Sequence, residues 1–171
     1  MFRLMGAALV IGASAAFGLG SMWRMSLRVR VLRDLLTALG TMKNEICDRT
    51  TPLPTLIDHL AAETKPPVYR FFHRLQQKMA DLGTRSFYAI WREAVEESGE
   101  LELEETERAT LADLGKTLGR YDIEEQAHTL RYTIRRLEGF LERAEEKKRL
   151  QGKVHAVLGM AVGVFVVLIL L

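Results

Sequence analysis

The sequence contains few groups of residues whose types and spacing could perform chemistry. Gly115-Lys116-Thr117 resembles the end of a phosphate-binding loop, in which backbone N–H groups and a lysine hold the phosphates of a nucleotide. The complete motif requires a glycine five residues before its Gly-Lys pair, where this chain has Thr110, and it requires a strand before the loop and a helix after it. Residues 115–117 are instead expected at the end of a helix, so we do not predict nucleotide binding.

Residues that could bind a metal or act as a nucleophile are scattered along the chain. Glu124 and His128 lie one helical turn apart, but no third ligand follows at a suitable spacing, so a solvated surface pair is favoured. Cys47, the single cysteine, excludes an intramolecular disulfide, and no histidine lies near it in sequence to act as its base. We predict no catalytic residue, cofactor or metal. The four histidines are His59, His73, His128 and His155.

Charge is distributed unevenly along the 171 residues. The chain has 24 basic and 22 acidic side chains and a formal net charge of +2, and 48% of its residues are hydrophobic. Residues 4–23 and 154–171 contain no Asp, Glu, Lys or Arg, so nearly all the charge lies between them. Because this central part is close to neutral, nucleic-acid binding driven by bulk charge is excluded.

The two apolar ends have the composition of membrane-spanning helices, which need about 20 apolar residues. We therefore predict a transmembrane anchor at residues 1–23, a helical domain at 24–153 and a second span at 154–171. Basic residues flank the central side of each span, and such clusters are retained in the cytoplasm, so the central domain is expected to be cytoplasmic. The flanking residues are Arg24, Arg28, Arg30 and Arg33, and then Lys147, Lys148, Arg149 and Lys153.

A cleaved signal peptide is the alternative for the first apolar run. Arg3 precedes this run, and Ala13-Ser14-Ala15 within it resembles a cleavage site. The run continues beyond that site to Trp23, and basic residues follow at once. These two features favour an uncleaved anchor.

Small residues in both apolar runs indicate helix packing within lipid. Apolar burial does not drive helix association there, and small side chains let two backbones approach closely. The series in the first run recurs every fourth position, and the second run contains one Gly-x-x-x-Gly pair. The candidate packing residues are Gly12, Ala16, Gly20, Gly159 and Gly163.

Apolar residues between the two runs recur with the 3.6-residue period of amphipathic helices, and no alternating strand pattern occurs. Thr51 is expected to cap the second helix, with Pro52 at its first position, and Ser86 and Asp122 are expected to begin the fourth and the last helices. Six apolar stripes with short connections predict an all-α, antiparallel six-helix bundle. The stripes include Phe71, Phe72 and Leu82 in the third helix and Ile123, Leu130, Ile134, Leu137 and Leu141 in the last.

Residues 93–107 are rich in glutamate and contain no lysine or arginine. A solvated helix face is the favoured interpretation, because runs of surface charge usually serve solubility. The alternative is an acidic docking surface for a basic partner.

Several elements, taken in order, resemble the stage III sporulation protein AB family over essentially the whole chain. They are the apolar anchor, Glu45 followed by Thr51-Pro52-Leu53-Pro54, Trp91-Arg92-Glu93-Ala94, the segment Leu-Ala-Asp-Leu-Gly-Lys-Thr-Leu-Gly-Arg-Tyr-Asp at residues 111–122, and the long final helix into the terminal apolar run. The chain departs from the expected pattern at residues 47–50, where Cys-Asp-Arg-Thr replaces a glycine-containing turn.

The resemblance implies a membrane protein of the mother cell in an endospore-forming bacterium, facing the forespore within a secretion-like channel complex. Its bundle would be similar to the six-helix F domain of type II secretion platform proteins (GspF-like). The implied partners are membrane lipid, other membrane proteins of the complex and a secretion-type ATPase, stage III sporulation protein AA. The candidate partner interface comprises Thr51, Pro52, Gly115, Leu118, Gly119 and Asp122.

Two functions of other classes remain as alternatives. One is a membrane-anchored enzyme that uses Cys47 or a metal held by histidine, and the other is an extracytoplasmic helical binding module exported by a cleaved signal peptide. The absence of an assembled active site in the sequence favours a non-enzymatic platform over the enzyme, and the features that favour an uncleaved anchor favour it over the exported module.

Overall fold

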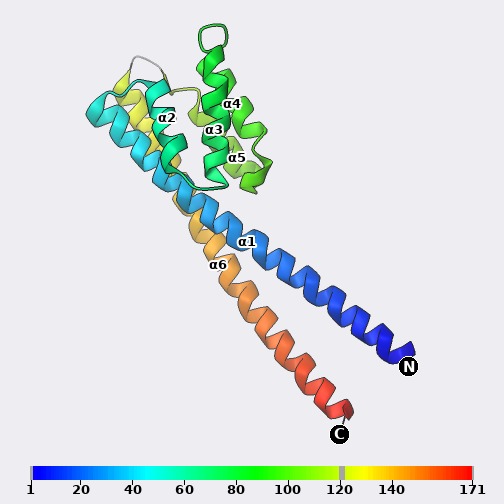
Figure 1. The fold of residues 1–171 in the computed structure, drawn as a ribbon. Helices are drawn as coiled ribbons and strands as arrows, with labels where there is room; N and C mark the ends of the chain where they lie inside the picture. Colours follow the sequence, from blue (N-terminus) through cyan, green and yellow to red (C-terminus); the bar gives the residue numbers. More distant parts are fainter. Residues whose placement is uncertain (1, 120–121, 171) are drawn as a thin grey trace. The chain divides into compact units, whose positions relative to one another are not determined.

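The chain is all-α in the part that the structure describes. The computed structural model describes the backbone of residues 2–119 and 122–170, and side chains of residues 23–119 and 122–151. Within these residues there are six α-helices, two short 3₁₀ turns and no β-strand (Figure 1), which confirms the predicted class. The helices are α1 (Phe2–Arg49), α2 (Leu53–Glu63), α3 (Val68–Lys78), α4 (Phe87–Glu96), α5 (Glu105–Leu114) and α6 (Ile123–Leu170), and the turns are η1 (Met79–Asp81) and η2 (Gly99–Leu101).

The chain divides into two compact units. One unit, which we call the bundle, is Arg28–Glu142, and the other combines Met1–Leu27 with Arg143–Leu171. Among the described residues, no helix is long and apolar enough to cross a membrane. Both spans and all five packing residues were predicted in the two apolar runs. Apart from Trp23, these runs lie outside the residues whose side chains are described. Membrane insertion therefore stays a prediction.

The core of the bundle follows the predicted apolar stripes. Helix α2 packs on α3, α3 on α4 and α4 on α5. At the centre, the rings of Phe71 and Phe72 pack edge to face with 4.8 Å between their centroids. Phe71 and Trp91 pack in the same way with 5.3 Å between their ring centroids. These three side chains are fully buried, so they supply much of the apolar area that stabilises the bundle.

Polar side chains cap two of the three helix starts for which a cap was predicted. The Ser86 hydroxyl accepts a hydrogen bond from the N–H of Ala89 at 3.2 Å, and Asp122 Oδ1 accepts from the N–H groups of Glu124 and Glu125 at 2.9 and 3.1 Å. The prediction for Thr51 is wrong, because Pro52 occupies the cap of α2 without a side-chain hydrogen bond. The Thr51 hydroxyl instead donates to the carboxylate of Glu45 in the last turns of α1.

The buried face of α6 is rotated from the predicted seam. Leu130 and Leu137 are buried as expected, but Ile134 and Leu141 are half-buried, and Ile123 is 41% exposed. Gln126, Thr133 and Phe140 are buried in their place. Both sets of residues are spaced three and four positions apart, but Gln126 and Thr133 are polar, so the apolar pattern favoured the other phase.

Candidate functional site

An open groove of about 330 Å³ lies within the bundle, and both sequence motifs of the resemblance contribute to it. The first motif (residues 51–54) follows α1, and the second (residues 111–122) runs from α5 to the start of α6. The groove also receives side chains from the connection between α3 and α4 and from the start of α4. Its lining residues are Ile46, Thr50, Thr51, Leu53, Leu82, Phe87, Gly119, Ile123 and Gln126.

The first motif is held by Glu45. The Thr51 hydroxyl donates to Glu45 Oε2 at 2.6 Å, the Thr51 N–H donates to the Glu45 carbonyl at 3.1 Å, and Arg49 Nη1 contacts Glu45 Oε1 at 2.7 Å. The hydrogen bond from Thr51, followed by the charge of Arg49, lowers the pKa of Glu45. Thr50 has φ of 51°, the left-handed conformation that glycine normally adopts. Thr50 therefore makes the turn for which the resemblance leads one to expect a glycine.

The second motif reaches the groove through Gly119. Its φ of +81° favours glycine, and a Cβ added there would lie 2.9 Å from Leu53 Cδ1. The Gly119 N–H donates to the side-chain oxygen of Gln126 at 3.2 Å. Gly119 is therefore favoured mainly by its backbone conformation, because the Leu53 methyl group that a Cβ would meet is the end of a flexible side chain and can rotate away.

Gly115 and Leu118 serve the core behind the groove. A Cβ on Gly115 would lie 2.5 Å from Trp91 Cδ1, and the indole N–H of Trp91 donates to the carbonyl of Leu111 at 2.7 Å. Leu118 is only 3% exposed. Of the six predicted interface residues, Thr51 and Gly119 line the groove, and Pro52 and Asp122 are exposed next to lining residues. Gly115 and Leu118 are buried, so they can influence a partner only through packing.

Leu82 and Ile123 are the lining residues that sequence reasoning placed wrongly in the core. Their side chains are 43% and 41% exposed. Leu82 comes just after η1, and Ile123 is the first residue of α6. The signal that could have identified them is this position at the ends of their stripes, where a helix no longer has a neighbour on every side.

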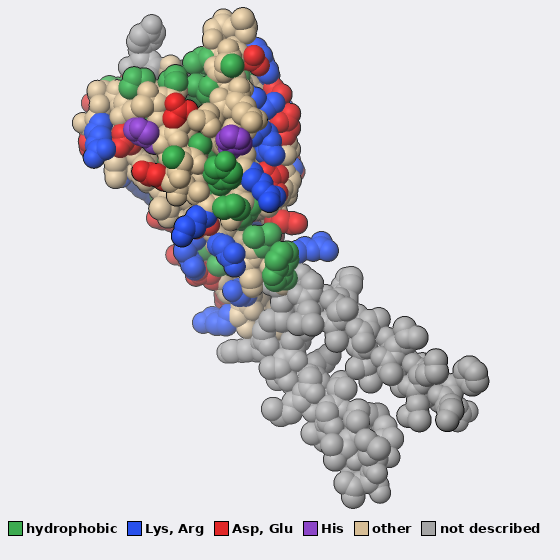
Figure 2. All heavy atoms as spheres, viewed as in Figure 1, with side chains coloured by type: hydrophobic (Ala, Val, Ile, Leu, Met, Phe, Trp, Pro, Cys, Tyr) green, Lys and Arg blue, Asp and Glu red, His purple; other side chains and the backbone are tan. Residues whose placement is uncertain are grey.

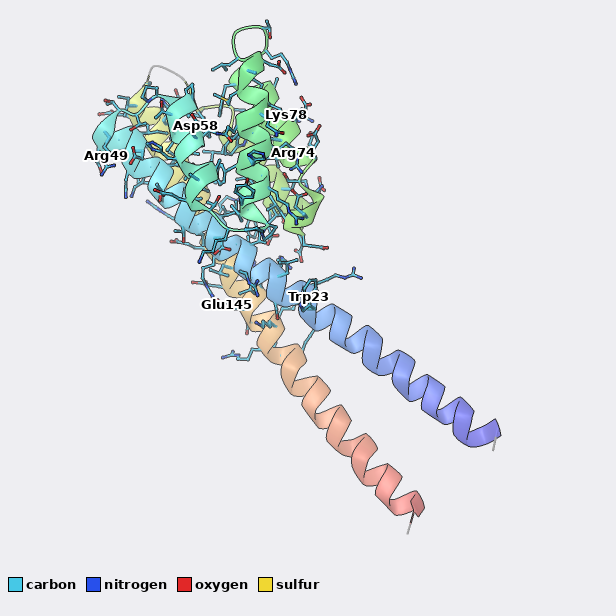
Figure 3. All side chains as sticks on the ribbon, viewed as in Figure 1. Trp23, Arg49, Asp58, Arg74, Lys78 and Glu145 are labelled. Carbon is cyan, nitrogen blue, oxygen red and sulfur yellow. The ribbon has the colours of Figure 1, made fainter. Side chains whose placement is uncertain are left out.

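The negative charge of the glutamate-rich segment (residues 93–107) is largely neutralised by basic side chains of the same bundle. Lys78 Nζ lies 2.5 Å from Glu93 Oε1 and 3.1 Å from Glu97 Oε2, and Arg85 also pairs with Glu93. The hydrogen bonds from Lys78 and then Arg85 lower the pKa of Glu93 to about 2. Arg74 pairs with Glu100 at 3.0 Å. Figure 2 shows acidic and basic side chains intermingled over α3 and α4, where Figure 3 labels Arg74 and Lys78. These pairs argue against a free acidic docking surface.

Arg28 joins the first and fifth helices. Its Nη2 lies 2.6 Å from Glu107 Oε1, and it also pairs with Glu104. Glu107 is fully buried, and its other oxygen accepts the Glu104 N–H at 2.8 Å, which caps α5. Burial would lower the pKa of Arg28, but its hydrogen bond to Glu107 and the charges of Glu107 and Glu104 raise it. The sequence pattern had assigned Arg28 only to the membrane flank.

The groups considered for chemistry are not assembled into a reaction centre among the described residues. Gly115 has a helical φ of −60° at the end of α5, and the ammonium group of Lys116 pairs with Asp113 at 2.6 Å. Cys47 is a half-buried free thiol. Within the described part of the chain, no three His, Cys, Asp or Glu side chains are placed to hold a metal ion.

Comparison with known proteins gives a consistent result. The family described as stage III sporulation protein AB matches residues 3–171. Stage III sporulation protein AB of Bacillus subtilis (strain 168) is 27% identical over 172 residues, which cover all of both chains. A solved structure of a stage III sporulation protein AB is 26% identical and superimposes with a TM-score of 0.67 over 72% of this chain and 98% of that one. The chain therefore belongs to the stage III sporulation protein AB family.

Proposed function

We propose that this protein is a non-enzymatic membrane platform of the secretion-like complex between mother cell and forespore. Its bundle, which we take to be GspF-like and cytoplasmic, would couple the membrane to a secretion-type ATPase, stage III sporulation protein AA. The observation that carries the proposal is the groove, in which the two family motifs meet and two large apolar side chains stay exposed. Such a surface suits binding rather than catalysis.

The described residues next to the apolar runs support the membrane part of the proposal. Trp23 is 73% exposed and is followed by the exposed Arg24. Before the second run, Lys147, Lys148 and Arg149 are also exposed. Tryptophan is enriched at the membrane–water interface, and clustered basic residues bind anionic headgroups on the cytoplasmic side.

Co-purification tests the coupling to the ATPase. The full chain is extracted from sporulating cells in mild detergent, and the recovered ATPase is measured for the parent, for Leu82→Asp with Ile123→Asp, and for Tyr132→Asp. Tyr132 is 54% exposed and does not line the groove, so it is a matched control. We expect at least a tenfold loss of ATPase for the groove variant and less than a twofold change for the control. The proposal fails if the parent recovers no ATPase or if both variants behave alike.

Topology is tested separately. The mass of the mature protein reports whether residues 1–23 are retained, and protease added outside mother-cell protoplasts reports which side carries the bundle. We expect an intact N-terminus and a protected bundle. A digested bundle or a missing first segment would contradict the cytoplasmic arrangement.

A further inference from the structure

We infer that the groove binds a basic amphipathic segment of another protein, which inserts two apolar side chains and places lysines or arginines over the rim. The inference deepens the proposed function and rests on it for the idea that the bundle binds a partner. It adds the chemistry of the bound segment, which follows from the apolar lining, the rim charges and the rigidity of the groove.

The lining supplies the apolar part of the site. Leu82 and Ile123 are two of the exposed large hydrophobic side chains in the described residues, and both line this groove. Ile46 and Phe87, which are 5% and 9% exposed, also line the groove. Its volume of about 330 Å³ is at the lower end of the range of about 300–1,000 Å³ for ligand pockets, so it suits inserted side chains rather than a folded domain.

The rim supplies the charge. Asp48, Asp81, Asp122 and Glu124 are exposed, and each lies within two residues of a lining residue. The described arginines at this rim are already engaged, Arg49 with Glu45, and Arg85 with Glu93 and, at 3.8 Å, with Asp81. Among the described residues, the charge that this rim offers to a partner is therefore mainly negative, from Asp48, Asp122 and Glu124, and electrostatic complementarity selects a basic segment.

The groove is preformed, which favours insertion of a regular element. Gly119 packs against Leu53 and donates to Gln126, and Thr51 is fixed by two hydrogen bonds to Glu45. Because these contacts hold the described lining residues in place, the site matches the helix-in-groove mode, in which apolar anchors recur at i and i+3 or i+4.

Photo-crosslinking in the full chain identifies the occupant. Benzoylphenylalanine is placed at position 82 or 123 in sporulating cells, with position 132 as the control, and the captured peptide is sequenced. We expect both groove positions to capture the same segment of another protein, with a net positive charge and apolar residues three or four positions apart. A neutral or acidic segment, a second copy of this chain, or capture no greater than at position 132 would overturn the inference.

Charge variants provide an independent measurement. Asp48→Lys with Asp81→Lys should reduce the capture yield at least fivefold, and Asp48→Asn with Asp81→Asn, which only removes charge, should reduce it at least twofold. The matched control is Glu138→Lys with Glu142→Lys, two exposed residues of α6 that do not line the groove. Equal yields in the rim variants and the control would overturn the inference.

The outcomes also separate this inference from the proposed function. If the ATPase co-purifies but the groove positions capture no basic segment, the inference fails and the platform role stands. If the captured basic segment belongs to a protein other than the ATPase and responds to rim charge, the inference is supported and the proposed partner is wrong.

Discussion

Replacing Gly115 by alanine should destabilise the bundle through one steric conflict. The added Cβ would lie 2.5, 2.7 and 3.0 Å from three atoms of Trp91. Trp91 is fully buried, packs against Phe71 and Phe87, and donates a hydrogen bond to the Leu111 carbonyl, so it cannot move aside freely. Overpacking costs about 1–3 kcal/mol, the weakened hydrogen bond costs about 1 kcal/mol more, and replacing glycine at a helical position returns about 0.4–1 kcal/mol, so we expect a net loss of about 1–3.6 kcal/mol.

The backbone itself would accept alanine at position 115. Its φ of −60° and ψ of −18° are helical, and at such positions Gly→Ala normally stabilises a protein by about 0.4–1 kcal/mol. Gly40→Ala and Gly139→Ala are therefore matched controls, because a Cβ at either position would meet nothing within 4 Å. Both controls should be neutral or slightly stabilising.

Urea unfolding of the full chain in detergent, followed by far-ultraviolet circular dichroism, measures these differences. A second variant tests the cause, because Trp91→Ala removes Cγ and Cδ1, two of the three Trp91 atoms that the new methyl group would meet. The double variant should then lose less stability than the sum of the two single losses. If Gly115→Ala is as stable as Gly40→Ala, or if the double variant is additive, the steric explanation is refuted.

Three further results are expected from the full chain. Arg28→Met should cost about 3 kcal/mol in urea unfolding, because it leaves the fully buried Glu107 without its cation, and adding Glu107→Gln should recover part of this loss. Asp122→Ala should lower the free energy of unfolding by about 1 kcal/mol, because it removes the cap of α6. Asp122→Asn should keep most of that stability, since the asparagine oxygen can still accept hydrogen bonds from the backbone N–H groups. The hydrogen bonds from Lys78 and a neighbouring arginine lower the pKa of Glu93 from 4.5 to about 2, so its stabilising contribution is present above pH 4.5 and is lost as the pH falls toward 2. Glu93→Gln should therefore be less stable than the parent at pH 7 and equal to it near pH 2; an equal difference at both pH values would contradict the pairing.

Local patterns predicted the helices well. The buried Phe71 and Phe72 of α3 and the caps at Ser86 and Asp122 depend on contacts within one or two turns, which the 3.6-residue period and the cap residue types report directly. The hydrogen-bond partner of the Thr51 hydroxyl was not predictable in this way. The hydroxyl could cap α2 or donate to a side chain of α1. The turn at Thr50 brings it close to the carboxylate of Glu45.

Contacts between distant segments were not predictable from the sequence. The partners Arg28 and Glu107 are separated by 79 positions, and the pairing of Arg74 with Glu100 also depends on how α3 packs against the following helices. The groove illustrates the same limit. The resemblance indicated Thr51 and Gly119, but the exposure of Leu82 and Ile123 depends on which neighbours cover the ends of their helices.

The ion pair between Arg28 and Glu107 also has a consequence for synthesis on the ribosome. At about 5–20 residues per second, the 79 positions between the partners correspond to about 4–16 s of translation. During that interval the apolar face of α1, which includes Val31, Leu32 and Leu35, lacks the later helices of the bundle. A ribosomal pause between these codons would extend the period in which the nascent chain can aggregate or recruit a chaperone.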